Sequence, residues 1–196
     1  MTSSALASPL FDTTIQQALY SPGAVANWFL SKAISMGKPI DHMQLQKMMY
    51  FAHGWNLARH NAPLVKEHAE AWEYGPVFPS VYHEYKKYGS APFPLGQSIL
   101  MEELEHNPNN PNNLAFQKHI VGSEDTRTIN ILEYVWNTYS GFSGTELSDM
   151  THKPDKSNPW TIFRDIANRF NMQSTDIPNG FIKSYFTTLA AKSLTF

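Results

Sequence analysis

The segment "DHMQLQKMMYFAHGWNLARHN", residues 41–61, constrains the fold more than any other part of this 196-residue chain. Its apolar residues recur at the three- and four-residue spacing of one helix face, and further apolar residues widen that face. A helix this apolar has to lie at the centre of the core. Asp41 and Gln44 form a capping-box pattern at its start. The apolar positions are Leu45, Met48, Met49, Ala52 and Trp55, widened by Tyr50, Phe51 and Leu57.

A glycine interrupts this predicted central helix. Gly54 in a helix interior costs about 1 kcal/mol relative to alanine. We therefore expect another helix or a strand to cross closely at this position.

Six further segments follow a helical pattern. The segment 21–39 has Ser21 as a cap and ends at Gly37 and Pro39. Ser143 and Glu146 stand in capping-box register, and Ser123 opens the segment before them. In the last helix we expect four apolar residues to pack inward: Phe181, Tyr185, Phe186 and Leu189. The remaining predicted helices cover residues 79–89, 123–141, 143–154, 158–170 and 178–193.

Residues 69–74 alternate between apolar and polar side chains, which is typical of a short strand. We expect this strand to pair with the Leu64–Val65 region. Gly75 and Pro76 should end it, because proline cannot donate to a ladder. The predicted fold class is therefore mainly α: a single compact helical domain with a small β-strand or hairpin element in its first half.

The domain organisation is predicted from composition. Residues 1–20 have little periodicity and indicate a loosely ordered leader, followed by one domain over 21–196. Residues around 91–122 contain "HNPNNPNN" and indicate an Asn/Pro-rich insertion. The chain lacks cysteine, which excludes disulfides, cysteine-ligated metals and thiol catalysis. It also lacks a membrane-length apolar run and a secretory signal pattern, so we expect a cytoplasmic protein with no membrane partner.

The stretch "EAWEYGPVFPSVYHEYKKYG", residues 70–89, concentrates aromatic rings beside rigid Gly-Pro and Pro turns. One interpretation is that Trp72, Tyr82 and Tyr85 fill the core while Tyr88 or Phe78 faces outward. The other is a docking surface, since tyrosine and tryptophan dominate interface hot spots. The third is a nucleic-acid stacking platform, which would need a cationic groove beside the rings. Only Lys66, Lys86 and Lys87 could form one, and the net charge of the chain is −2, so this interpretation ranks last.

Catalytic and metal-binding motifs are not found. There is no nucleophile elbow, phosphate-binding loop or paired-histidine metal motif, so we expect no cofactor and no metal site. His53 and His60 share a predicted helix face, but His53 lies among apolar residues and is interpreted as a hydrogen-bonded core residue. His152 is either a general base or the end of a helix, where an imidazolium suits the dipole. Glu70, Glu73 and Glu84 stand near aromatics without a fixed separation.

Three blocks of the sequence resemble the Panacea domain of the SocA-like antitoxin family. The first is a helix of the form L-Q-K-L-x-Y-x-x-x-G-x-x-L, with Met48 here at its fourth position. The second contains A-W-x-Y-G-P-V-x-P-x-V-Y, and the third contains L-S-x-x-T-H followed by P-W. The matching residues are Leu45, Gln46, Lys47, Tyr50, Gly54 and Leu57; then Ala71, Trp72, Tyr74, Gly75, Pro76, Val77, Pro79, Val81 and Tyr82; then Leu147, Ser148, Thr151, His152, Pro159 and Trp160.

The resemblance implies a protein that binds another protein. Its family members are similar to antitoxins that neutralise partner toxins by direct contact, in one form as adaptors to an ATP-dependent protease, and some are carried by phages. It implies no catalytic residue. The hypothesis is therefore a toxin-binding module; the alternative is a small hydrolase or transferase on the same scaffold that uses His152 or His53. The expected partner-binding residues are Trp72, Tyr74, Gly75, Pro76, Phe78, Tyr82, Tyr85 and Tyr88.

Overall fold

The structure is a computed structural model and describes residues 20–94, 121–152 and 155–193. All of the predicted leader at residues 1–20 except Tyr20, and most of the predicted insertion at 91–122, lie outside the described residues. The described elements are α1 (Pro22–Ser35), α2 (His42–His60), β1 (Ala69–Trp72), β2 (Gly75–Val77), α3 (Pro79–Tyr85), the 3-10 helix η1 (Lys86–Tyr88), α6 (Thr126–Tyr139), α7 (Gly144–Thr151), α8 (Pro159–Arg169), β3 (Asp176–Ile177) and α9 (Asn179–Ser193). The fold is mainly α with a small antiparallel sheet, as predicted.

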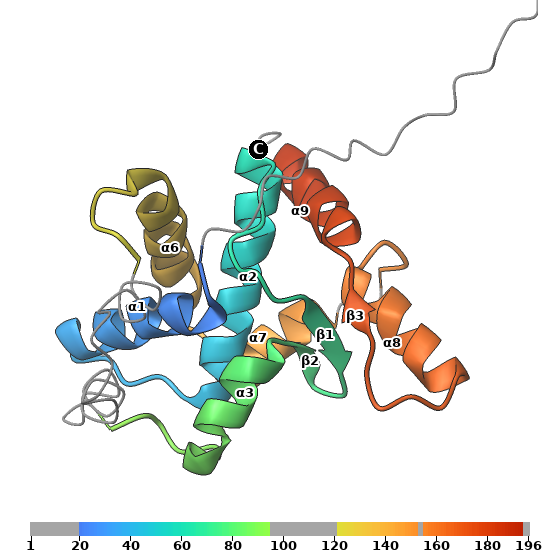
Figure 1. The fold of residues 1–196 in the computed structure, drawn as a ribbon, viewed down its shortest axis with the longest axis horizontal. Coiled ribbons are helices and arrows are strands. Elements are labelled where there is room, and N and C mark those ends of the chain that lie inside the picture. Colours follow the sequence, from blue (N-terminus) through green and yellow to red (C-terminus); the bar gives the residue numbers. More distant parts are fainter. Residues whose placement is uncertain (1–19, 95–120, 153–154, 194–196) are drawn as a thin grey trace, which may run out of the picture.

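Helix α2 runs through the middle of the molecule (Figure 1). It packs against α1, α3, α6, α7, α9 and β2, and the side chains of its predicted apolar face are buried. The predicted capping box is confirmed: the Asp41 carboxylate accepts from the Gln44 backbone N–H at 2.7 Å, and the Gln44 side chain accepts from the Asp41 N–H at 2.9 Å. Asn61 ends the helix in the left-handed conformation. Local signals therefore set both ends of the central helix.

The close crossing predicted at Gly54 is formed by α9. A Cβ at Gly54 would overlap the ring of Phe186, which is buried at the centre of α9. Figure 1 shows α9 beside the upper part of α2. The absence of a side chain thus allows the two helices to pack around one aromatic ring.

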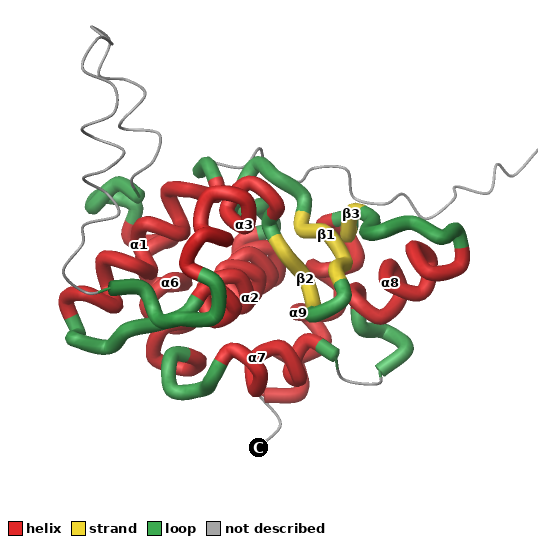
Figure 2. The backbone as a smooth tube through the Cα atoms, turned by 90° about the horizontal axis from the view of Figure 1, so that it is seen from below, coloured by secondary structure: helices red, strands yellow, loops and turns green. Residues whose placement is uncertain are grey.

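The small sheet has the strand order β2–β1–β3, with both pairings antiparallel (Figure 2). The predicted strand is confirmed over Ala69–Trp72, but its predicted partner is wrong. It pairs with β2 and β3, whereas Val65 makes an isolated parallel bridge with Tyr20.

The strand ends before Gly75 and Pro76, as predicted, at Trp72, but these two residues do not lie outside the sheet as expected, because both belong to β2. Proline is tolerated there because β2 lies at the sheet edge, where its missing N–H breaks no ladder bond. Gly75 has a φ of +102°, which allows the chain to turn back from β1.

The remaining helices follow the sequence signals with two corrections. Ser21 caps α1, and the Ser143–Glu146 capping box of α7 is present. Helix α6 begins later than predicted, because Asp125 rather than Ser123 provides its cap. Phe181 does not pack inward: it is 47% exposed and contacts Phe163 at the surface, with the inward position at this turn taken by Ile182.

Candidate functional site

The β1–β2 hairpin is the element on which the three sequence blocks converge. Its two-residue tip, Glu73 and Tyr74, lies at the surface, and the Tyr74 side chain is 63% exposed. Trp72, just before the tip, is half-buried. The tip is therefore available for contact while its flanking strands are packed against the protein.

Two consecutive side chains of α2 close the outer edge of β2. Gln46 accepts from the Phe78 N–H at 2.9 Å and donates to the Phe78 carbonyl at 3.4 Å. The Lys47 ammonium donates to the Tyr74 carbonyl and, at 3.3 Å, to the Pro76 carbonyl. The backbone groups with which an added strand would pair at this edge are thus already used, and the Pro76 nitrogen has no hydrogen to donate.

Lys47 is nearly fully buried, with 1% of its surface exposed. Burial lowers the pKa of its ammonium to about 7, because a charge is unfavourable in a low-dielectric interior. Close to neutral pH the side chain is therefore partly uncharged. A neutral amine still has two N–H donors for the two hairpin carbonyls.

The third sequence block also supports the hairpin. Ser148 on α7 donates to the Tyr74 carbonyl at 2.9 Å, and the Trp160 indole on α8 donates to the Trp72 carbonyl at 2.8 Å. The Trp160 ring also stacks on His152, with ring centroids 4.0 Å apart. Residues far apart in the sequence therefore hold one short hairpin in place.

The remaining motif residues build this support. Asn158 donates to the Thr151 carbonyl at 2.9 Å and caps α8, and Pro159 occupies the first turn of α8. The Thr151 hydroxyl donates to the Ser148 carbonyl at 2.7 Å. These contacts set the position of α8, and with it that of Trp160.

The predicted partner-binding residues divide into a buried and an exposed group. Phe78, which was expected to face outward if Tyr88 did not, is completely buried and stacks edge-on with His53 at 5.7 Å. Tyr85 is buried as well and donates to Asn27 at 3.1 Å. Phe78 directly precedes α3 and Tyr85 is its last residue, and both side chains are directed to the core. Of the others, Tyr74 is exposed, Trp72, Tyr82 and Tyr88 are half-buried, and Gly75 and Pro76 are buried within β2.

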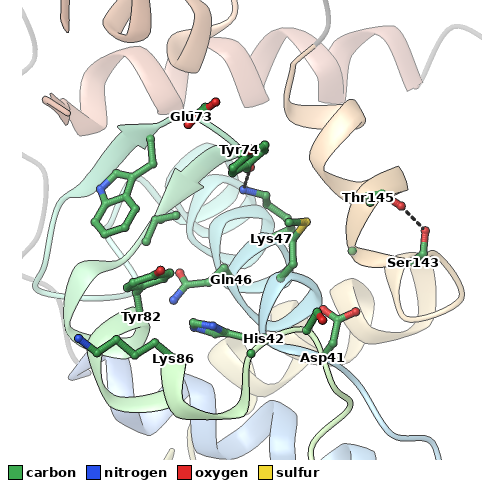
Figure 3. A pocket seen from close by; sticks show the side chains of 16 residues that line it. Asp41, His42, Gln46, Lys47, Glu73, Tyr74, Tyr82, Lys86, Ser143 and Thr145 are labelled. Carbon is green, nitrogen blue, oxygen red and sulfur yellow. Dashed lines mark hydrogen bonds between the residues drawn. The ribbon is translucent and has the colours of Figure 1, made fainter. Parts of the chain in front are cut away.

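A pocket of about 560 Å³ opens beside the hairpin (Figure 3). Its walls come from the start of α2, the hairpin, the α3–η1 segment and the start of α7. Trp72 and Tyr82 contact each other across one wall, with ring centroids 4.6 Å apart, and His42 stacks against Tyr82 at 5.1 Å. From the sequence, Asp41 was predicted only as a helix cap and His42 was not singled out, because no motif marks either as a pocket residue.

The two histidines considered for catalysis have structural positions. His53 is fully buried, with Nε2 2.8 Å from the Asn179 side chain and Nδ1 accepting from the Val65 N–H at 3.4 Å. The predicted hydrogen-bonded core histidine is therefore confirmed, and burial lowers its pKa to about 4. His152 follows the last turn of α7 as predicted. However, burial and nearby Lys47 lower its pKa, so the charged form is disfavoured there.

The described residues contain neither a metal site nor a membrane-spanning helix. Glu70 accepts from the Trp72 indole at 2.8 Å and from Ser174 at 2.5 Å. Within residues 20–94, 121–152 and 155–193, no cluster of three or more histidine or acidic side chains is arranged to hold a metal ion. None of the helices in these ranges combines the length and the apolar character needed to cross a bilayer.

Comparison with known proteins agrees with the three sequence blocks. The family model for the antitoxin SocA-like Panacea domain matches residues 45–161, which is more than half of the chain, so the chain belongs to this family. Antitoxin SocA of Caulobacter vibrioides (strain NA1000 / CB15N) is 47% identical over 66 residues. That match covers 34% of this chain and 35% of the relative, about a third of each. No solved structure matches the chain.

Proposed function

We propose that this protein is an antitoxin that neutralises a partner toxin by direct contact through the hairpin tip. The observation that supports it most is the set of buried or partly buried hydrogen bonds by which Gln46, Lys47, Ser148 and Trp160 hold the backbone around one exposed turn. Such support keeps the turn in one conformation before the partner arrives, which reduces the entropy lost on binding.

The proposed contact surface consists of the hairpin tip and the adjoining aromatic residues. Tyr74 provides an exposed ring, and Trp72, Tyr82 and Tyr88 are half-buried beside it or along the α3–η1 segment. Aromatic side chains with restricted motion provide most of the binding energy in many interfaces. Phe78 and Tyr85 support this surface from below, because both are buried.

The matched relative is an antitoxin, which supports a toxin as the partner of this protein. Neutralisation of a toxin has two forms. The protein either blocks the toxin in a stable complex or presents it to an ATP-dependent protease. Both forms require direct contact with the toxin, so the proposed surface is the same for each.

Growth tests with neighbouring gene products provide the functional experiment. A gene whose product arrests growth when expressed alone, and whose arrest is relieved by this protein, identifies the toxin; purified proteins should then form a complex. Relief that persists in a strain lacking the protease indicates blocking, and relief that disappears indicates the adaptor form. Failure of the protein to relieve any arrest, together with the absence of a complex, would contradict the proposed function.

A further inference from the structure

We propose that the pocket beside the hairpin receives one aromatic side chain of the partner, a tyrosine or a tryptophan with its hydrogen-bonding group directed inward. This inference rests on the proposed function, since it assigns the chemistry of the residue that the partner inserts. The pocket volume of about 560 Å³ is ample for a single ring and lies within the range of small-ligand sites.

The walls of the pocket suit a ring. Trp72 and Tyr82 form an aromatic wall with an interplanar angle of 55° between them, and Val77 and Met43 add apolar surface. An inserted ring can therefore make the edge-to-face or offset contacts that aromatic pairs prefer. Charged groups also line the pocket: Asp41 and Lys47 come from the start of α2, and Figure 3 shows Glu73 at the upper rim and Lys86 on the opposite side.

A buried polar atom in the same wall calls for a hydrogen-bonding group. His42 is only 7% exposed, and among the described residues its Nε2 has no hydrogen-bond partner. An unpaired buried nitrogen is costly; a phenol O–H would satisfy it in either imidazole tautomer, and an indole N–H where Nε2 is the acceptor. Because Nε2 is covered, side chains around it have to shift to expose this atom when the ring enters.

The closed sheet edge favours insertion of a side chain over addition of a strand. The outward backbone groups of Tyr74, Pro76 and Phe78, along and beside β2, are already bonded to Gln46 and Lys47, so the partner's backbone has no free edge to extend here. The pocket also includes Tyr74 of the exposed tip in its lining. A partner segment that contacts the tip therefore passes the mouth of the pocket, which is why we assign the ring to the partner.

The test uses p-cresol as a mimic of the tyrosine side chain and toluene as the same ring without the hydroxyl. The ¹⁵N-labelled protein is titrated to about 5 mM of each probe, which stays within the aqueous solubility of toluene and suits the weak affinity of so few atoms. We expect saturable shifts at the Trp72 indole and His42, with p-cresol binding roughly 3–10-fold more tightly than toluene, as one hydrogen bond provides. His42→Leu should abolish this preference, and His68→Leu, at an exposed position, should retain it.

A second variant keeps the test decisive if His42→Leu fails to fold. Thr145 is exposed and lines the pocket, so Thr145→Trp should fill the mouth without disturbing the core. We expect this variant to lose p-cresol binding and to bind the toxin at least tenfold more weakly than the wild-type protein.

Two outcomes overturn the inference. The first is the absence of saturable p-cresol binding, or equal binding of both probes. The second is wild-type toxin affinity in Thr145→Trp, which would leave the proposed function intact and refute only the inserted ring. Absence of toxin binding by the wild-type protein would instead refute the proposed function itself.

Discussion

Replacing Lys47 by methionine should change how the stability of this protein depends on pH. The folded-state pKa of Lys47 is about 7, against an ordinary value of 10.5. Between these values the unfolded chain binds more protons than the folded one, so the free energy of unfolding rises with pH in this window. Methionine has no ionisable group and removes this contribution.

The size of the effect follows from the two pKa values. One group titrating between about 7 and 10.5 adds about 2 kcal/mol to the free energy of unfolding from pH 7 to pH 9. The stability difference between wild type and Lys47→Met should therefore move by that amount in favour of the wild type. Loss of the hydrogen bonds to the hairpin adds a constant offset of about 1–3 kcal/mol for an unpaired carbonyl.

Urea unfolding followed by tryptophan fluorescence at several pH values between 7 and 9 measures this difference. Lys66→Met provides the matched control, because Lys66 is exposed and the substitution removes the same charge. Its difference from wild type should stay constant across the range. If Lys47→Met also runs parallel to the wild type, Lys47 is not buried as its packing against the hairpin requires.

Three further predictions concern packing, acid stability and the hairpin support. Gly54→Ala should destabilise the protein by about 1–3 kcal/mol through overlap with Phe186, whereas Gly180→Ala, with open space around it, should not; denaturant unfolding compares them. Between pH 7 and pH 5, protonation of His53 in the unfolded chain should lower the free energy of unfolding by about 2 kcal/mol, because the folded-state pKa of His53 is only about 4. His53→Gln should remove this loss of stability at acidic pH. Trp160→Phe should cost about 1 kcal/mol and speed hydrogen exchange in the hairpin, which unchanged exchange would contradict.

Local signals in the sequence predicted the helices well. Asp41 with Gln44, and Ser143 with Glu146, were read as capping boxes, and both are formed. Gly54 predicts that another element crosses closely at this position, because a glycine in a helix interior usually has a packing reason. The structure confirms this crossing, which is made by α9.

The sheet could be predicted only in part, because its pairing depends on residues distant in sequence. The two residues of β3 carry no periodic signal, and Pro76 was read as a strand breaker although it lies at a sheet edge. The direction of Phe78 depends on how α3 packs on α2, which the local pattern does not specify. It was left open between the core and the surface, and it is buried.

The candidate site shows the same division. The motif residues were identified from the resemblance, but their common role in holding the hairpin appears only in three dimensions. The position of Lys47 within the largely apolar stretch "QKMMYF" was the one local sign that this lysine is buried and hydrogen-bonded inside the protein. His42 and the start of α7 had no such sign, since a pocket forms where separate elements meet.

The most direct test of the account is the affinity of the toxin for two surface variants, measured by calorimetry. Tyr74→Ala removes the exposed ring at the hairpin tip, and Phe170→Ala removes a ring that is 69% exposed elsewhere on the surface. Both should fold as the wild type does. The account predicts that Tyr74→Ala weakens binding at least tenfold while Phe170→Ala leaves it unchanged, as expected for an interface hot spot of about 1.4 kcal/mol or more. Wild-type affinity in Tyr74→Ala, or an equal loss in both variants, would contradict the assignment of the hairpin tip as the binding surface.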